Sequence, residues 1–222
     1  RNNLQYIETI PPFRAIASPY LSFLNVKYIL VPVASDPIKG IQSGQFVVVK
    51  ENANRGWRLY ENTKVFPRFF VATNVQKESN REAVLSAIKQ ASLPARQGSV
   101  DPKSTIIVDG SAVDVSGFAP DCPVGYQGTV SVTSYDYERI EIISTNPCNA
   151  FLDTSEVMYP GWRAAVDGKR VPVFENNAAF RTIYLPKGAH TIEFSYRPTI
   201  VLWGAMISLL AAIIAVVVWR AD

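Results

Sequence analysis

The sequence has little of what metal binding and redox chemistry require, since its 222 residues include one histidine and two cysteines. Two lone cysteines cannot form a structural zinc site without several histidines, and the chain has only His190. The CxxC pattern of thiol redox enzymes is missing too. We therefore expect neither a metal site nor a cofactor.

Signals for nucleotides and nucleic acids are also missing. The chain has no GxGxxG or P-loop pattern, so nucleotide binding has no support. The formal net charge is only +3, and the longest basic cluster is Lys169-Arg170. Because no basic patch stands out, we expect no nucleic-acid partner.

No constellation of catalytic side chains stands out either. A sugar-processing enzyme needs paired carboxylates, and the sequence offers Asp153 with Glu156 and Asp136 with Glu138. These pairs lie near expected turns and strand ends, where carboxylates are usually solvated. Alternation along its strand places His190 on an apolar face, which predicts a packed histidine rather than a base. We assign no catalytic residue to this chain.

What the sequence does have is a long apolar run near its C-terminal end. Residues 200–219 read IVLWGAMISLLAAIIAVVVW and carry no charge. As a helix this run is about 30 Å long, the thickness of the hydrocarbon core of a bilayer. Trp203 and Trp219 lie near its two ends, where indole rings favour the headgroup region. We interpret residues 199–219 as a transmembrane helix.

The connection to this helix is short. The last expected strand ends near Arg197, so that only Pro198 and Thr199 separate it from the apolar run. Two residues are too few for a free linker. We therefore expect the folded part to lie close to the bilayer surface, with membrane lipid as a partner.

The side of the membrane follows from the cysteines rather than from the charges. Three basic residues shortly precede the helix and one follows it, so the positive-inside rule alone places the domain in the cytoplasm. However, long domains cross membranes largely regardless of charge. A disulfide between Cys122 and Cys148 would persist only in an oxidising compartment, whereas the alternative is a pair of buried free thiols. We expect the disulfide, and hence residues 1–198 on the extracytoplasmic side of the cell membrane.

The chain before the helix divides into two expected domains. Residues 1–120 combine strand-like apolar runs with one helix, which begins at a capping-box pattern in residues 79–82 (SNRE) and stops near Pro94. Residues 121–198 contain strands at short, regular spacing, with a hairpin turn at Asp167-Gly168. The expected fold class is α+β, a mixed α/β N-terminal part followed by an antiparallel β-sandwich and one C-terminal transmembrane helix.

The C-terminal residues resemble a known family. Residues 159–173 (YPGWRAAVDGKRVPV) look like the YPGW…VDGK…VP signature near the end of YfhO-type bacterial membrane proteins. The resemblance continues, in order, through residues 179–181 (AFR), 185–194 (LPKGAHTIEF) and 196–198 (YRP). Shorter and weaker matches lie at residues 24–29 (LNVKYI), 60–62 (YEN) and 67–68 (PR). Because the long multi-helix region of that family is not in this sequence, which starts at Arg1, we expect a piece of a longer chain.

The resemblance implies a function. YfhO-type proteins are similar to GT-C membrane glycosyltransferases, which take sugars from polyprenyl-phosphate carriers at the outer face of the membrane. Their catalytic acidic residues lie in a loop that this sequence does not contain, so whether the chain is part of an enzyme stays open. The resemblance implies an accessory or acceptor-side domain in cell-envelope glycosylation, next to an upstream transmembrane bundle and a polyprenyl-phosphate sugar or glycan acceptor.

Two alternatives remain open at this point. One is a non-catalytic, membrane-anchored module that binds carbohydrate or a protein partner. The other is a purely structural ectodomain of a transporter-like protein.

Four residues in or near the signature are candidate contacts for a ligand or for lipid headgroups. Tyr159 and Trp162 flank a Pro-Gly turn, where a ring could stack on a sugar or lie at headgroup level, although Trp162 could equally be a core residue. Arg163 and Arg181 carry guanidinium groups that match phosphate geometry. They could instead pair with Glu175 across the sheet.

Overall fold

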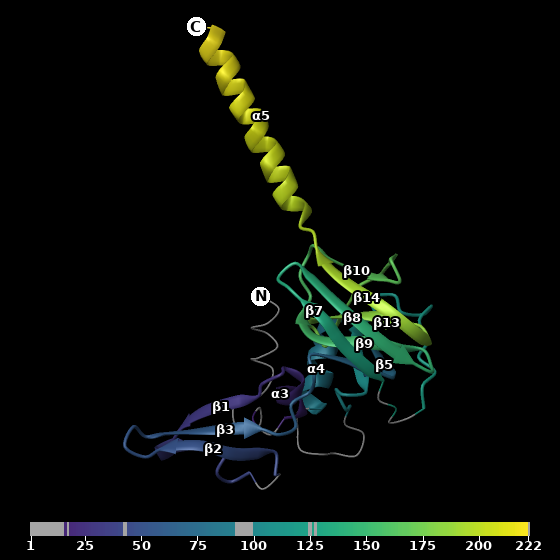
Figure 1. Cartoon of the computed structure of the whole chain (residues 1–222). Coiled ribbons are helices and arrows are strands. Elements are labelled where there is room, and N and C mark those ends of the chain that lie inside the picture. Colours follow the sequence, from purple (N-terminus) through teal and green to yellow (C-terminus); the bar gives the residue numbers. More distant parts are fainter. Residues whose placement is uncertain are drawn as a thin grey trace.

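The computed structural model describes residues 16, 18–41, 44–91, 100–123, 126 and 128–221. It confirms an α+β fold of mostly antiparallel sheets that ends in one apolar helix (Figure 1). The elements, in chain order, are α3 (Pro19–Phe23), β1 (Tyr28–Pro32), η1 (Val33–Ser35), β2 (Phe46–Asn52), β3 (Trp57–Asn62), β4 (Phe69–Ala72), β5 (Asn74–Glu78), α4 (Arg81–Ala91), β6 (Thr105–Asp109), β7 (Thr129–Tyr135), β8 (Arg139–Asn146), β9 (Ala150–Val157), β10 (Trp162–Val166), β11 (Lys169–Val171), β12 (Phe174–Asn176), β13 (Phe180–Leu185), β14 (Gly188–Tyr196) and α5 (Thr199–Ala221).

Two antiparallel sheets pack face to face in the C-terminal part. One has the strand order β11-β10-β14-β8-β7 and the other β12-β13-β9-β4. Alternate side chains of their strands point into the space between them, as the period-2 pattern of the sequence predicts. The buried residues of this core are Phe69, Ile140, Ile142, Leu152, Ala164, Val166, Ile183, Leu185, Ile192 and Phe194.

The predicted hairpin joins β10 to β11. Its strands pair antiparallel from Ala164↔Val171 to Val166↔Lys169. The two turn residues, Asp167 and Gly168, have φ angles of 51° and 76°. Both positive values match a two-residue turn that favours an Asp-Gly pair, so the turn signal in the sequence was correct.

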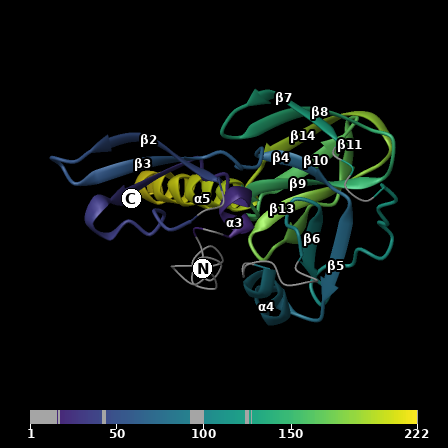
Figure 2. The same ribbon diagram turned by 90° about the horizontal axis from the view of Figure 1, so that it is seen from below.

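The N-terminal part is joined to the sandwich through β4. This strand pairs antiparallel with β9, so a strand from before residue 120 completes a sheet of the C-terminal part. The parallel strands β5 and β6, together with α4 and α3, lie against the other face of that sheet (Figure 2). The division of the chain at residue 120 stays a prediction, and the structure shows that the two parts share hydrogen bonds and core.

Helix α4 begins one residue later than the capping-box pattern indicated. The side-chain oxygen of Asn80 accepts a hydrogen bond from the Ala83 N–H at 3.0 Å, so Asn80 and not Ser79 is the N-cap. Val84, Ile88 and Ala91 form its buried face. The expected stop near Pro94 lies outside the described residues.

A separate antiparallel sheet, with the order β1-β3-β2, extends from the body of the protein on the side away from α5 (Figure 1). One face packs on a small core around Val31, Ile38 and Tyr60. On its surface Tyr28, Leu30 and Val47 are exposed by half or more of their area.

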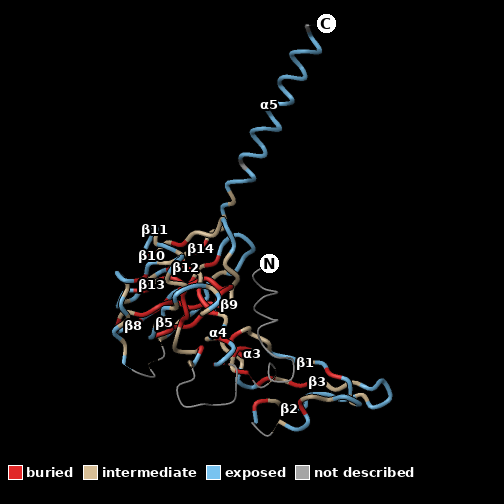
Figure 3. Tube along the Cα trace, turned by 180° about the vertical axis from the view of Figure 1, so that it is seen from behind, coloured by how far each residue is buried: buried red, intermediate tan, exposed pale blue. Residues whose placement is uncertain are grey.

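Helix α5 projects from the sandwich and is pale blue, hence exposed, along its described length (Figure 3). Among the described residues it is the one helix long and apolar enough to span a membrane, and none of its apolar span is buried in the protein. Apolar side chains exposed on every face match a helix surrounded by lipid.

Candidate functional site

The candidate site lies where β14 meets α5. Strand β14 ends at Tyr196, and α5 begins at Thr199. The Tyr196 N–H donates to the Glu138 carbonyl at 2.8 Å, and the Arg197 N–H donates to the Gly161 carbonyl at 2.8 Å. The turn between β7 and β8 and the turn between β9 and β10 therefore hold the connection from two sides.

Gly161 makes this close packing possible. Its φ angle is 111°, a value that residues with a Cβ rarely adopt. A Cβ atom there would lie 2.9 Å from the Tyr196 ring and 3.1 Å from the Pro198 Cα. The Pro-Gly turn of the signature is thus explained by the approach of its backbone to the start of α5.

The two predicted aromatic contacts, Tyr159 and Trp162, both lie at this junction. Tyr159 is 61% exposed, and its ring centroid is 6.5 Å from that of Tyr196. Trp162 is half-buried against the sandwich core, with its ring centroid 5.4 Å from Tyr196. Trp162 is therefore both a core residue and an accessible contact surface, because it packs on the core while part of its surface stays accessible.

Arg181 lies beneath Trp162 rather than on the surface. Its side chain is 1% exposed, and its guanidinium carbon lies 3.9 Å from the centre of the Trp162 ring, a cation–π contact. Burial lowers the pKa of Arg181 to about 10, so the guanidinium remains charged at neutral pH. It donates to the Val157 carbonyl at 3.0 Å. A buried guanidinium presents no surface to a headgroup, and the structure gives Arg181 the role of supporting Trp162.

The alternative pairing with Glu175 is not formed by Arg181. Glu175 lies opposite Arg181 in the register of β12 and β13, but its carboxylate binds Arg81 of α4, with Nη1 2.6 Å from Oε1. Arg181 instead has the Glu156 carboxylate at 3.5 Å.

Arg163 borders an open groove of 410 Å³ beside the junction. The groove has apolar and basic walls, formed by Met158, Trp162, Arg163, Arg170, Val171, Pro172 and Val173. In the described part of the chain, no carboxylate forms an ion pair with Arg163 or Arg170. Sequence reasoning found Arg163 but missed Arg170, whose position follows only from the pairing of β10 with β11.

Tyr137 is a further residue that sequence reasoning missed. It lies in the turn between β7 and β8 and is 99% exposed. The same turn provides the Glu138 carbonyl that binds the Tyr196 N–H. The sequence signal that could have identified it is an aromatic residue between two acidic residues, in a turn that joins two strands of alternating apolar and polar residues.

The carboxylates near the signature are engaged by the fold. Asp153, expected at the solvated surface, is fully buried on β9, where its Oδ1 accepts hydrogen bonds from the Thr154 N–H and the Asn176 side-chain amide. Burial raises its pKa to about 8. Glu156 accepts from Arg68 at 2.9 Å and from the Tyr135 hydroxyl at 2.7 Å.

His190 was expected to pack in the core, but the structure places it outside the core. Ile192 and Phe194 of the same strand are buried, but His190 lies at the end of the sheet where the core stops. Its Nδ1 is 2.6 Å from Oδ2 of Asp167, and its Nε2 is 3.2 Å from the Lys187 carbonyl oxygen.

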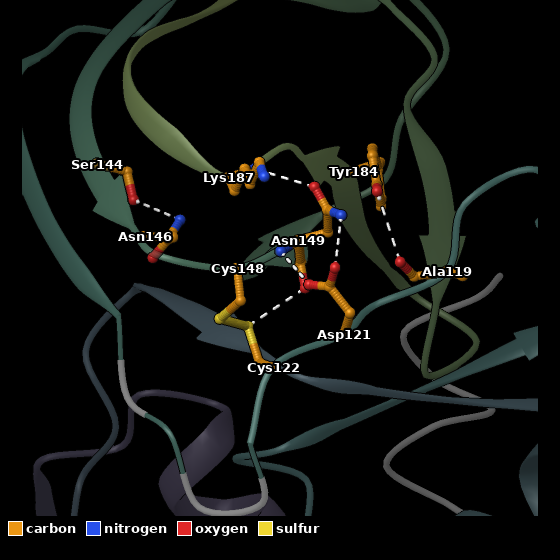
Figure 4. Close-up of a disulfide and its surroundings, with 9 residues drawn as sticks. All are labelled: Ala119, Asp121, Cys122, Ser144, Asn146, Cys148, Asn149, Tyr184 and Lys187. Carbon is orange, nitrogen blue, oxygen red and sulfur yellow. Dashed lines mark hydrogen bonds between the residues drawn. A yellow bond between two sulfur atoms is a disulfide. The ribbon is translucent and has the colours of Figure 1, made fainter.

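The predicted disulfide between Cys122 and Cys148 is present (Figure 4). Next to it, Asp121 accepts hydrogen bonds from the Asn149 backbone at 2.6 Å and from the Asn149 side chain at 2.9 Å. The Asp121 carboxylate lies near both sulfurs. Because the sulfurs are bonded to each other, however, the cluster offers no thiolate to a metal.

Comparison with known proteins identifies the segment that contains the junction. Residues 139–208 match the model of the family described as bacterial membrane protein YfhO. No curated protein and no solved structure matches the chain. The matched segment starts with β8, includes the Tyr159 to Trp162 turn and the connection after β14, and continues into α5. The comparison therefore supports a YfhO-type region over residues 139–208.

Proposed function

We propose that this chain is the extracytoplasmic C-terminal domain of a multi-span membrane protein that works as a GT-C-like glycosyltransferase. In this proposal a polyprenyl-phosphate carries the sugar, and the domain has an accessory, acceptor-side role in cell-envelope glycosylation. The observation that carries the proposal is the family match, which covers the sandwich strands from β8 to β14 and the start of the membrane helix. The glycosyltransferase activity comes from the resemblance of that family to GT-C enzymes.

The accessory role is supported by how the fold uses its carboxylates. Asp153 is buried and Glu156 is bound by Arg68 and Tyr135, so both are held by contacts within the domain. The accessible side chains near the membrane helix are aromatic and basic instead, and such groups bind sugars and phosphates. We assign to them the positioning of an acceptor, with the chemistry carried out elsewhere in the protein.

The extracytoplasmic location is supported by the disulfide, because such bonds persist in oxidising compartments. A cysteine placed at Asn54, an exposed residue of the β2–β3 turn, tests it in intact cells. We expect a membrane-impermeant maleimide to label Asn54→Cys before the membrane is permeabilised. Labelling only after permeabilisation would place the domain in the cytoplasm and end this part of the proposal.

The enzymatic role is tested in cells that lack the gene. We expect the deletion to remove a sugar from envelope polymers, as measured by hydrolysis and sugar analysis, and the full-length gene to restore it. Trp162→Ala should restore it only partly at equal protein level, whereas Trp57→Ala, in β3 on the distant sheet, should restore it fully. Unchanged sugars in the deletion strain, with binding of glycans by the purified protein, would instead support the non-catalytic binding module.

A further inference from the structure

The junction fixes which parts of the sandwich lie at the height of the lipid headgroups. Helix α5 is apolar from Ile200 onward, so the hydrocarbon region begins close to Pro198 and Thr199. The carbonyls of Glu138 and Gly161 bind the two backbone N–H groups immediately before this point. The turns that contain Glu138 and Gly161 therefore lie beside the first turn of the membrane helix.

Each of these turns presents an exposed tyrosine. Tyr137 is 99% exposed in one turn, and Tyr159 is 61% exposed in the other. Tyrosine and tryptophan rings are enriched at membrane–water interfaces. Trp203, in the second turn of α5, is a third exposed aromatic residue near the junction.

The groove next to the Tyr159 turn suits an amphipathic anion. Arg163 and Arg170 are its two basic groups, and the described residues provide no ion-pair partner for either. Met158, Pro172 and Val173 supply apolar walls. Guanidinium groups bind phosphate in a bidentate manner, and the apolar walls fit the glycerol and upper acyl region of a lipid.

We propose that this groove binds the phosphate headgroup of a phospholipid from the leaflet that faces the domain, while Tyr137 and Tyr159 lie in the interface on either side of α5. Trp162 forms the wall between the groove and Tyr196, and the buried Arg181 guanidinium packs against its ring. This inference rests on the proposed function only for the position of the sandwich against a membrane. It requires no glycosyl transfer.

The full-length protein in lipid nanodiscs provides the test. One set of nanodiscs contains phosphatidylcholine alone, and the other contains phosphatidylcholine mixed with phosphatidylglycerol. The measured quantities are the enrichment of phosphatidylglycerol on the released protein, by native mass spectrometry, and the hydrogen-exchange protection of β10 and β11. We expect enrichment and protection with phosphatidylglycerol for the unmodified protein.

Two variants and a control make the test specific. Arg163→Gln and Arg170→Gln should each reduce the enrichment roughly fivefold, since one arginine near an anionic surface contributes about 1 kcal/mol. Arg55→Gln, an exposed arginine in the distant β2–β3 turn, should have no effect. Arg163→Lys with Arg170→Lys should retain part of the binding, which separates loss of charge from loss of structure.

Three results would overturn the inference. The first is equal enrichment for the glutamine variants and the unmodified protein. The second is an equal loss for Arg55→Gln, which would indicate a nonspecific charge effect. The third is protection of β10 and β11 by inorganic phosphate alone in detergent, which would make the groove a site for a soluble anion. Loss of lipid binding in the glutamine variants with unchanged envelope sugars would leave this inference standing and count against a role of these arginines in positioning the acceptor.

Discussion

Asp153 and Arg181 are ionisable side chains held inside the protein, where burial favours the neutral form of each. Burial therefore raises the pKa of Asp153 and lowers the pKa of Arg181. With a pKa near 8, the Asp153 carboxyl is largely protonated at neutral pH. Arg181 stays charged and is held by a carbonyl, a carboxylate and the Trp162 ring. The sequence could not indicate either burial, because Asp and Arg are found mostly at surfaces and nothing in their neighbourhood marks these positions as core.

The pKa of Asp153 leads to a pH-dependent stability. The folded pKa of about 8 lies above the ordinary value near 3.9, so the folded protein binds the extra proton and its stability is highest at low pH. Stability should then fall by at most about 1.4 kcal/mol per pH unit as the pH rises from about 4 to 8. Asp153→Asn should remove this slope, as measured by the free energy of unfolding in urea at several pH values.

The exposed Asp136 provides the control for this measurement. Asp136→Asn should follow the unmodified protein at every pH. Parallel curves for Asp153→Asn and the unmodified protein would show that Asp153 keeps an ordinary pKa when folded.

Alanine substitutions at two glycines with positive φ angles distinguish the cost of backbone strain from the cost of a steric clash. Gly168 has open space where a methyl group would lie, so Gly168→Ala should cost only the strain of its left-handed backbone, about 1 to 2 kcal/mol. Gly161→Ala adds a clash with Tyr196 and Pro198, which raises the cost by a further amount of about 1 to 3 kcal/mol. Thermal unfolding measures both, and an equal loss of stability would show that the junction is not tightly packed.

At the scale of elements, the parts with local signals were predictable. The β10–β11 hairpin follows from its Asp-Gly turn. Strand β9 was missed, because its central position in the sheet buries residues on both faces and its sequence, with Asp153 and Thr154, does not alternate. The pairing of β4 with β9 is a long-range contact for which the local sequence holds no signal.

The disulfide joins the segment before β7 to the turn between β8 and β9, across a sequence separation of 26. In the loop-entropy model such a bond stabilises the fold by about 3.5 kcal/mol. Cys122→Ser with Cys148→Ser should lose about this much stability, and a reducing agent should lower the unmodified protein to the same level. The serine variant should not respond to the reducing agent. Alkylation of both cysteines in freshly isolated, unreduced protein would contradict the bond.

At the scale of the whole molecule, the two-residue connection and its two backbone hydrogen bonds fix α5 relative to the sandwich. An insertion of Gly-Ser-Gly after Arg197 should release this constraint. A nitroxide label on Tyr137→Cys should lie at headgroup depth in the unmodified connection and move into water after the insertion, as measured by its accessibility to oxygen and to a water-soluble nickel reagent. The same insertion after Ala53, in the β2–β3 turn, should not change the depth of the label.

The fixed connection makes the orientation of the folded part sensitive to the thickness of the bilayer. An apolar helix that is too long for its membrane tilts to keep its side chains in lipid. Because no slack separates α5 from β14, that tilt swings the whole sandwich, and the β1-β3-β2 sheet at the opposite end of the molecule travels through the widest arc (Figure 1). The distance of the exposed residues Leu30 and Val47 from the membrane surface then depends on bilayer thickness. The acyl-chain length of the lipids therefore controls how far from the membrane this apolar sheet can contact another molecule.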